Sequence, residues 1–374
     1  MSVIEQQLIK ALEQLDEQYT GLFKWLAYQY DPLLGGFYYA RSSKESTHFK
    51  PDIESTAQAI NMLIRNDALS FLPEEIKNKL IHFFQRKQVK ETGYFLDDDP
   101  MMEKDEVMVQ RALGYSVNAL KRLGSEPLYP LPLKAKAAPA FTKSVEAYIE
   151  KWKSIDLSNS WRGCDLLATS CIYLQEMDEK ERLPFLNAAT EYLASLQDQQ
   201  TGLWGEGSLY VQISGTFKLH TFYSKFHIPL PNRDKIYKSI ITCLRTEKAI
   251  DMCYIRNPID LLVYLDLDLS DEELLEIIQI TTKNISRLKR IDGGFSREID
   301  HSPKAPNVAQ VKEGECYPHM PEPVFLGEGL VEGDMNASTQ ATLIRMQCYR
   351  LAKKKVLPLQ EEAVEFFEYV ESIS

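Results

Sequence analysis

Two carboxylates stand at the start of an otherwise apolar segment, in the stretch Pro51-Asp52-Ile53-Glu54-Ser55-Thr56-Ala57. A carboxyl group beside apolar walls has a raised pKa and can act as a general acid, whereas a better solvated one stays ionised as a base or nucleophile. Because residues i and i+2 do not share a helix face, Asp52 and Glu54 could reach one substrate only in the first turn. The pair therefore predicts acid–base chemistry at a helix N-terminus.

Acidic residues recur where other helices are predicted to start. Asp165, Asp260 and Asp334 each stand at the beginning of an apolar helical segment. An aspartate at a helix start is also the usual N-cap and interacts favourably with the helix dipole, so a structural role is the alternative for each of them. Only Asp52 and Glu54 form a close pair. We predict Asp52, Glu54 and Asp334 as the catalytic residues.

Other polar side chains are predicted near the same helix starts. Such groups are costly to bury without hydrogen bonds, so they indicate a wet pocket for a polyhydroxyl or carboxylated ligand. Aromatic rings there could stack on sugar faces, although Trp204 also suits the packing of its own turn and His220 a hydrogen-bonded core position. The predicted substrate-binding residues are His48, Arg162, Asp165, Trp204, Tyr210, Gln212, His220, Arg256, Asn257 and Asn336.

The elements that would position these residues form a repeat. Apolar residues at helical spacing predict an outer helix over 3–29, and a Gly-Gly-Phe turn at 31–37 leads to an inner helix whose first residue is Pro51. Turns of similar composition recur at 91–95, 198–204 and 292–295. Roughly six helical hairpins of about 50 to 60 residues follow. They predict an all-α fold, an (α/α)6 toroid in a single domain over 1–374, with an open superhelix of helix pairs as the alternative.

In a toroid, the inner helices would bring their polar first turns to one rim. The predicted inner-helix starts lie near Asp52, Asp165, Ser208, Asn257 and Asp334. The later outer helices are predicted over 182–197 and from Asp271 to about Arg290.

An acidic run at 97–99 has the composition of a magnesium-diphosphate motif. Such motifs project carboxylates from one helix face, whereas here Pro100 breaks the run and a turn at 93–95 precedes it. We interpret the run as a solvated loop, with weak calcium binding as the alternative. The sequence has no His/Cys/carboxylate cluster with ligand spacing and no phosphate-binding or dinucleotide-binding glycine motif, so we predict no metal and no cofactor.

Composition bounds the class of protein. The chain has 374 residues, 44% of them hydrophobic, and a net charge of -11, so it can bury a large core but is not expected to bind nucleic acid or an anionic membrane. It shows neither a signal sequence nor a run of roughly 18 apolar residues, which predicts a cytoplasmic protein. The six cysteines lack C-x-x-C spacing and are predicted to be reduced, mostly buried thiols. The expected partner is a small-molecule or oligosaccharide substrate.

The turn Gln197-Asp198-Gln199-Gln200-Thr201-Gly202-Leu203-Trp204 resembles one found repeatedly in six-hairpin, (α/α)6 carbohydrate enzymes such as the unsaturated glucuronyl and rhamnogalacturonyl hydrolases, and the turns at 31–37 and 292–295 are similar to it. These turns also resemble the Gln/Trp repeats of squalene-hopene-type cyclases and the toroidal subunit of protein prenyltransferases. The frame at 52–57 resembles the cyclases' Asp-x-Asp-Asp-Thr-Ala acid motif, with Glu54 and Ser55 in place of its second and third acids. The turn is typical of the fold rather than of one reaction.

Three classes of function remain open. The first is a carbohydrate-active glycoside hydrolase, lyase or epimerase with carboxylate acid–base chemistry in a polar toroid cavity, which the polar helix starts favour. The second is a terpenoid-cyclase-like enzyme in which Asp52 or Glu54 protonates an isoprenoid; the acid-motif frame favours it, but its cavity would have to be apolar. The third is a toroidal binding protein without catalysis. We predict the first, with the substrate, the reaction type and the oligomeric state left open.

Overall fold

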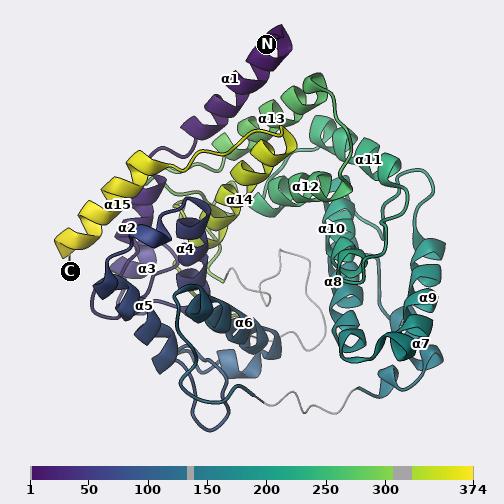
Figure 1. Cartoon of the computed structure of the whole chain (residues 1–374), viewed down its shortest axis with the longest axis horizontal. Coiled ribbons are helices and arrows are strands. Elements are labelled where there is room, and N and C mark those ends of the chain that lie inside the picture. The colour runs from purple at the N-terminus through teal and green to yellow at the C-terminus, as the bar shows by residue number, and fades with distance from the viewer. Residues whose placement is uncertain (1, 133–138, 306–321, 374) are drawn as a thin grey trace. The chain divides into compact units, whose positions relative to one another are not determined.

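The computed structural model describes residues 2–132, 139–305 and 322–373. Over these residues the chain forms helices and turns, and its only β-pairing is in isolated bridges (Figure 1). The prediction of an all-α protein is confirmed. The helices are α1 (Val3–Glu17), α2 (Leu22–Tyr28), α3 (Arg41–Glu45), α4 (Ile53–Arg65), α5 (Glu74–Arg86), α6 (Glu106–Arg122), α7 (Val145–Lys153), α8 (Ser160–Ser170), α9 (Glu179–Leu196), α10 (Leu209–Lys225), α11 (Arg233–Thr246), α12 (Met252–Leu265), α13 (Asp271–Ser286), α14 (Met335–Leu351) and α15 (Gln360–Ile373).

The chain divides into two compact units, which are described separately below. Unit 1 consists of Met1–Ala11, Leu133–Thr281 and Arg350–Lys353. Unit 2 consists of Leu12–Pro132, Thr282–Tyr349 and Lys354–Ser374. The assignment of the whole chain to a single domain stays a prediction.

Unit 2 is built around α4, α6 and α14. Helix α6 packs against both α4 and α5, and α15 packs against α2. Helix α14 is tied to α4 because the Arg65 guanidinium donates to the Thr339 carbonyl at 2.9 Å and Thr339 Oγ1 donates to the Gln58 carbonyl at 3.3 Å. Fully buried aromatic side chains fill the core of this unit: Tyr19, Phe23, Tyr30, Phe37, Tyr39, Phe83, Phe84 and Phe95.

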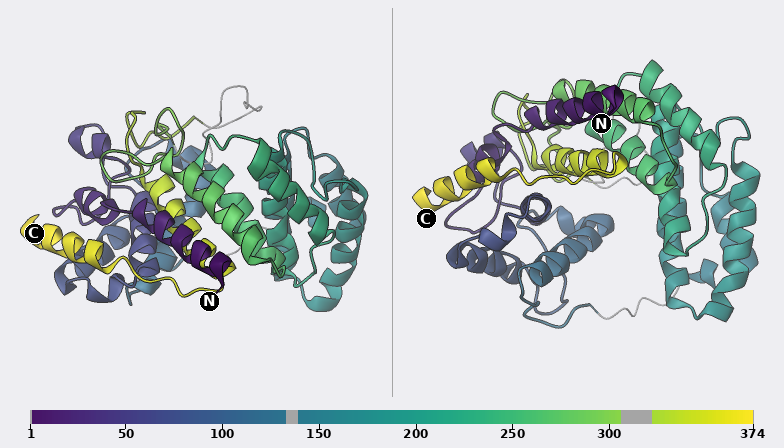
Figure 2. Two further views of the ribbon diagram at one scale, coloured as in Figure 1. Left: turned by 90° about the horizontal axis from the view of Figure 1, so that it is seen from above. Right: turned by 45° about the horizontal axis from the view of Figure 1, so that its top comes forward.

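Unit 1 is built around α8, α10 and α12, which pack in succession (Figure 2). Helix α7 packs on α9, and α11 packs on α10 and α12. The buried Trp152 ring contacts Tyr148 and Phe222, with ring centroids 5.2 and 5.9 Å away. Each unit thus has apolar helix faces turned inward, as the helical spacing of apolar residues predicts.

Three of the turns between helices share one hydrogen-bond pattern, which confirms that the turn recurs. In the first turn, the Gly35 amide donates to the Asp31 carbonyl at 2.8 Å and the Asp31 amide donates to the Gly36 carbonyl at 2.9 Å. The same two bonds recur with Gly93 and Val89, and with Gly202 and Asp198. The three glycines Gly35, Gly93 and Gly202 have φ of 72°, 75° and 72°, a left-handed conformation that disfavours side chains.

Alanine in place of the turn glycine Gly35 should destabilise the protein by more than its strained backbone conformation alone would. Gly35 and Gly124 have nearly equal φ, 72° and 75°, but a Cβ on Gly35 would lie 2.6 Å from the Lys79 carbonyl oxygen, whereas one on Gly124 meets nothing within 4 Å. We expect Gly124→Ala to lower the free energy of unfolding by about 1 kcal/mol and Gly35→Ala by a further 1 kcal/mol or more, on the order expected for backbone strain plus a steric clash. Urea unfolding of both variants measures the difference, and equal losses would contradict the close approach.

Two predicted boundaries in unit 2 are wrong. The helix expected over 3–29 ends as α1 at Glu17 and resumes as α2 at Leu22, directly after Gly21, which has a left-handed φ of 82°. Helix α4 begins at Ile53 rather than at Pro51, because Asp52 is extended and acts as its N-cap.

The starts of two inner helices in unit 1 are also wrong. Helix α8 begins at Ser160 with Asn159 as its N-cap, and α12 begins at Met252 with Asp251 as its N-cap. Both caps accept a hydrogen bond from the first turn and so fix the helix start earlier than expected. Asp165, Asn257 and Asp260 consequently lie one to two turns inside their helices. The outer helix expected to reach Arg290 ends as α13 at Ser286.

Among the described residues, Cys164, Cys171 and Cys243 are free thiols. Cys164, Cys171, Cys243 and Cys348 are buried and Cys253 is partly exposed, which agrees with the prediction of reduced, mostly buried thiols. Burial raises the pKa of Cys164 and of Cys171 to about 12, so these thiols are poor nucleophiles. Cys316 lies outside the described residues.

Candidate active site

The N-terminus of α4 is the centre of the candidate site in unit 2. Asp52 Oδ1 accepts a hydrogen bond from the Ser55 amide at 2.8 Å, and the residue is only 3% exposed. Asp52 Oδ2 is buried and has no hydrogen-bond partner among the described residues. A buried carboxylate oxygen without a donor is energetically unfavourable, whereas a protonated carboxyl group tolerates the same place. The geometry therefore favours the neutral form of Asp52.

A second carboxyl group, Asp97, reaches the same helix end from the loop after α5. Both of its oxygens lie 3.1 Å from the Ile53 amide, and Lys87 Nζ lies 3.1 Å from Oδ1. The Asp97 side chain is 14% exposed and that of Lys87 is 8% exposed. The interpretation of 97–99 as a solvated loop is therefore wrong for Asp97, because the loop turns this carboxylate inward to cap α4; Asp98 remains about half exposed.

Burial raises the pKa values of both Asp52 and Asp97. Burial is the larger cause of the rise for Asp52, and the neighbouring negative charge of Asp97 is the next, which together raise its pKa to about 8. Burial also raises the pKa of Asp97, while the Lys87 ammonium and the Ile53 amide oppose that rise. The two acids are thus in different environments, and the proton stays preferentially on Asp52.

Glu54 is positioned differently from Asp52. One of its oxygens forms an ion pair with Arg111 of α6 at 2.6 Å and accepts a hydrogen bond from Gln58 Nε2 at 3.0 Å. Glu54 is 9% exposed, whereas the Arg111 side chain is 34% exposed and also donates to the Tyr115 hydroxyl at 3.2 Å. Asp52 and Glu54, two residues apart at one helix start, therefore have different partners.

Asp334, the third predicted catalytic residue, is buried, and both of its carboxylate oxygens accept hydrogen bonds. Oδ1 accepts a hydrogen bond from the Ala337 amide at 2.7 Å, and Oδ2 accepts from the Arg297 amide and from Ser302 Oγ, both at 2.7 Å. Burial raises its pKa to about 6, against the lowering effect of these bonds. Asp334 ties the segment 297–302 to the start of α14, which is a structural arrangement.

The other predicted residues of unit 2 lie apart from these contacts. His48 is exposed in the segment before α4. Asn336 is partly buried in the first turn of α14, where its Oδ1 accepts a hydrogen bond from Gln340 Nε2 at 2.9 Å.

In unit 1, part of the predicted set lies on the face of α8 and α10. The Arg162 guanidinium and Lys218 Nζ lie over the ring of Trp161, 5.1 and 5.7 Å from its centroid. Lys218 also forms an ion pair with Asp165 at 2.9 Å. All four side chains are partly exposed. This face combines hydrogen-bonding groups with an aromatic ring.

A second part of the set lies on α10 and α12 of the same unit. Arg256 forms an ion pair with Asp260 at 2.9 Å and lies over the ring of Phe217, 4.8 Å from the centroid. His220 packs between Phe217 and Tyr264, with ring centroids 4.8 and 4.6 Å away. Burial lowers the pKa of His220, so the imidazole is neutral at pH 7.

The remaining predicted residues of unit 1 serve packing in this structure. Trp204 is fully buried and donates a hydrogen bond to the Leu193 carbonyl at 2.8 Å, which matches the alternative that it packs its own turn. Tyr210 is buried and stacks on Tyr254, with an interplanar angle of 4°. The remaining two polar groups hydrogen-bond within the unit: Gln212 to the Gly205 carbonyl and Asn257 to Ser214.

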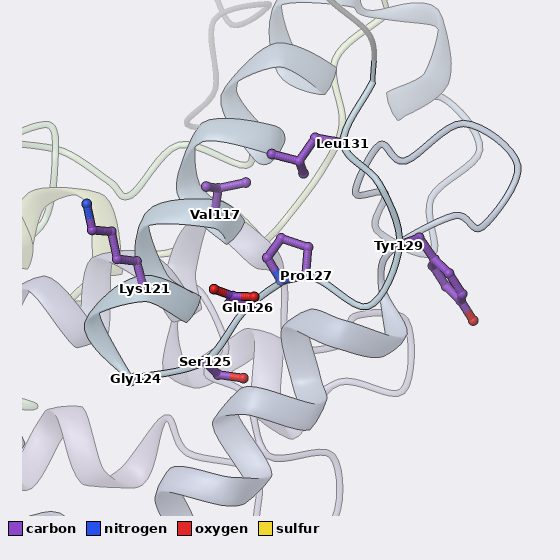
Figure 3. Close-up of a pocket in the computed structure, with 8 residues that line it drawn as sticks. All are labelled: Val117, Lys121, Gly124, Ser125, Glu126, Pro127, Tyr129 and Leu131. Atoms are coloured by element: carbon purple, nitrogen blue, oxygen red, sulfur yellow. The ribbon is translucent and has the colours of Figure 1, made fainter.

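A hollow of about 510 Å³ lies in unit 2, at the C-terminal end of α6 (Figure 3). Its lining consists of Val117, Lys121, Gly124, Ser125, Glu126, Pro127, Tyr129 and Leu131. None of the predicted site residues is among them. We therefore place the candidate site by its chemistry, at the start of α4.

Sequence reasoning missed Asp97 as a site residue, although the repeat contains a signal for it. Asp97 comes two residues after the turn aromatic Phe95, and Glu206 follows Trp204 in the same way. The Glu206 carbonyl accepts from the amide of Ser160, the first residue of α8, at 3.0 Å. Alignment of the turns would have placed Asp97 at the start of an inner helix.

No family model matches the chain, and no curated protein or solved structure is detectably similar to it. In the described ranges, no three His, Cys, Asp or Glu side chains gather in a way that could hold a metal ion. Over the same ranges, no helix is long and apolar enough to cross a membrane.

Proposed function

We propose that the chain is a carbohydrate-active enzyme of the glycoside hydrolase, lyase or epimerase type in which Asp52 donates the proton. The observation that carries this proposal is the Asp52 carboxyl, which is buried, has a pKa of about 8 and leaves Oδ2 without a hydrogen-bond partner among the described residues. A general acid that works near pH 7 must still hold its proton there. A carboxylate that served only as an N-cap would be stabilised by the helix dipole in its ionised form.

Glu54 is proposed as the second carboxyl group of the reaction. One of its oxygens pairs with the Arg111 guanidinium at 2.6 Å, whereas burial raises the pKa of the Asp52 carboxyl. Acid and base roles on one site require two carboxyl groups whose environments push their protonation states apart. Because Arg111 is 34% exposed, a substrate that reaches Glu54 would approach along α6.

Unit 1 carries a face of its own that suits a sugar ligand. The face of α8, α10 and α12 carries Trp161 together with the ion pairs Asp165–Lys218 and Arg256–Asp260, all partly exposed. Rings that stack on sugar faces, beside charged groups that hydrogen-bond hydroxyls, suit a polyhydroxyl ligand better than an apolar one. The repeated turn and helix pairs likewise support a six-hairpin (α/α)6 toroid as the finer description of the fold.

The proposal is tested with a panel of neutral and uronic-acid oligosaccharides. The purified chain is incubated with each, and the products are identified by mass spectrometry, which separates addition of water from elimination. We expect at least one uronide or glycoside to be converted by the wild-type chain and not by Asp52→Asn. Conversion at equal rates by both proteins, or of no sugar at all, would overturn the proposal.

A terpenoid-cyclase-like reaction is the second candidate, because the neutral Asp52 carboxyl also suits protonation of an alkene. The buried apolar residues Ile53 and Phe37 favour this candidate. Phe37 is next to Asp52 because its carbonyl accepts a hydrogen bond from the Asp52 amide at 3.3 Å. Incubation with linear isoprenoids, followed by gas chromatography of the extract, separates the two candidates. A cyclic product that depends on Asp52 would favour the second over the first.

Glu54→Gln should lower turnover by about 10² to 10⁴, the usual contribution of a positioned acid or base. The change is isosteric and leaves an oxygen for Gln58, so the fold should be retained. The matched control is Glu106→Gln, since Glu106 is an exposed glutamate in the first turn of α6 and should be silent. Turnover numbers measured side by side decide the matter, and equal losses in both variants would remove Glu54 from the site.

A further inference from the structure

The start of α4, like that of α10, receives a carboxylate from another part of the chain. The amides that begin α8 and α14 donate to main-chain carbonyls, those of Glu206 at 3.0 Å and Tyr39 at 2.8 Å. At α4 and α10 the corresponding amides, those of Ile53 and Leu209, donate to the carboxylates of Asp97 and Glu247 instead. The carboxylate at α4 shares its helix start with a second, buried carboxyl group, that of Asp52.

Lys87 fixes this carboxylate. Its ammonium lies 3.1 Å from Asp97 and 3.4 Å from Asp98, and Asp98 is also paired with Lys50 at 3.1 Å. The other charged pair at this helix start is Glu54 with Arg111. Asp52 is the one carboxyl group of this set for which no cation is within ion-pair distance in the described residues.

We propose that Asp97 is a positioning residue for Asp52: held by Lys87 and by the Ile53 amide, it keeps a fixed negative charge beside the Asp52 carboxyl and so retains the proton there. Two carboxyl groups close together in a buried place cannot both ionise, and they titrate as a pair. Asp97 accepts from an ammonium and an amide, whereas Asp52 accepts only from the Ser55 amide. The negative charge therefore belongs on Asp97 and the proton on Asp52.

The catalytic meaning of this arrangement rests on the proposed function, but the arrangement itself does not. Asp97 would set the pH range over which the acid is available without touching the substrate. Lys87, 8% exposed, would act through Asp97. The two residues should consequently change the proton affinity of Asp52 in opposite directions when they are replaced.

The test is a direct titration of Asp52 in the full chain. The protein is labelled with ¹³C at the aspartate carboxyl carbons, and the resonance that is lost in Asp52→Asn is followed against pH. Asp97→Asn, whose amide oxygen can still accept from Ile53, should lower the midpoint by on the order of one pH unit or more, because the repelling charge is gone. Lys87→Met should raise it. Asp99→Asn, at a neighbour whose carboxylate accepts a hydrogen bond from the Met101 amide, should leave it unchanged.

These outcomes distinguish the inference from the proposed function. An unchanged midpoint in Asp97→Asn, or shifts of the same sign in Asp97→Asn and Lys87→Met, would overturn the inference whatever the activity of the chain. If Asp97→Asn fails to fold, the upward shift in Lys87→Met decides alone. The expected shifts together with full activity of Asp52→Asn would support the inference while the proposed function fails.

Discussion

Asp52→Asn is expected to lower turnover by about 10² to 10⁴ while the fold is retained. Asparagine is isosteric with aspartate and caps a helix as well, so the amide side chain would still accept from the Ser55 amide. It cannot give up a proton as a carboxylic acid does. Turnover and the urea midpoint are to be measured on the same preparation, so that a loss of rate cannot be ascribed to unfolding.

The matched control for this experiment is Asp105→Asn. Asp105 is the N-cap of α6, is 1% exposed and accepts from the amides of Val107 and Met108, so it resembles Asp52 in burial and in capping. We expect this variant to keep its turnover. Equal turnover in wild type, Asp52→Asn and Asp105→Asn would leave a binding protein without catalysis as the better interpretation.

The stability of the wild-type protein is expected to fall as the pH rises from about 4 to about 8. The folded pKa of Asp52, about 8, lies above the unfolded value of about 3.9, so the folded state binds more protons than the unfolded state throughout that window. The stabilisation that the protonated Asp52 contributes is fully present below its unfolded-state pKa and is lost as the pH rises through its folded-state pKa. For one such group, each pH unit lowers the free energy of unfolding by up to about 1.4 kcal/mol. Asp334, with a pKa raised to about 6, acts in the same direction over the lower part of the window.

Urea unfolding at several pH values across this window measures the slope. Asp52→Asn should flatten it, because asparagine does not titrate, and should be the more stable protein at the alkaline end. Asp334→Asn should flatten only the lower part. A stability that rises with pH, or a slope that is unchanged in Asp52→Asn, would show that Asp52 is ionised in the folded protein.

The turns could be predicted from the sequence because their cause is local. A left-handed residue between two hydrogen bonds requires glycine, and Gly35, Gly93 and Gly202 therefore mark the repeat. The helix starts of α8 and α12 were misplaced because Asn159 and Asp251 compete as caps with polar residues further along. Such competition is decided by packing, which the local sequence does not contain.

The candidate site was only partly predictable. Asp52 could be found because an aspartate directly before an apolar helical segment is a preferred N-cap, and the structure places it there. Asp97 could be found only by aligning the turns with one another, since it reaches Ile53 across 44 residues of chain and its pairing with Lys87 depends on the folded turn. The aromatic residues could not be sorted at all: Trp204 is a core side chain, whereas Trp161 is partly exposed, and nothing in composition separates them.

The pH dependence of turnover tests most directly whether Asp52 works as an acid. With a converted substrate in hand, kcat of the wild-type protein should be constant near neutral pH and fall on the alkaline side around pH 8, as Asp52 loses its proton. The residual rate of Asp52→Asn should lack that alkaline limb. An alkaline limb that persists in Asp52→Asn, or a wild-type rate that increases as Asp52 ionises, would contradict the assignment of Asp52 as the proton donor.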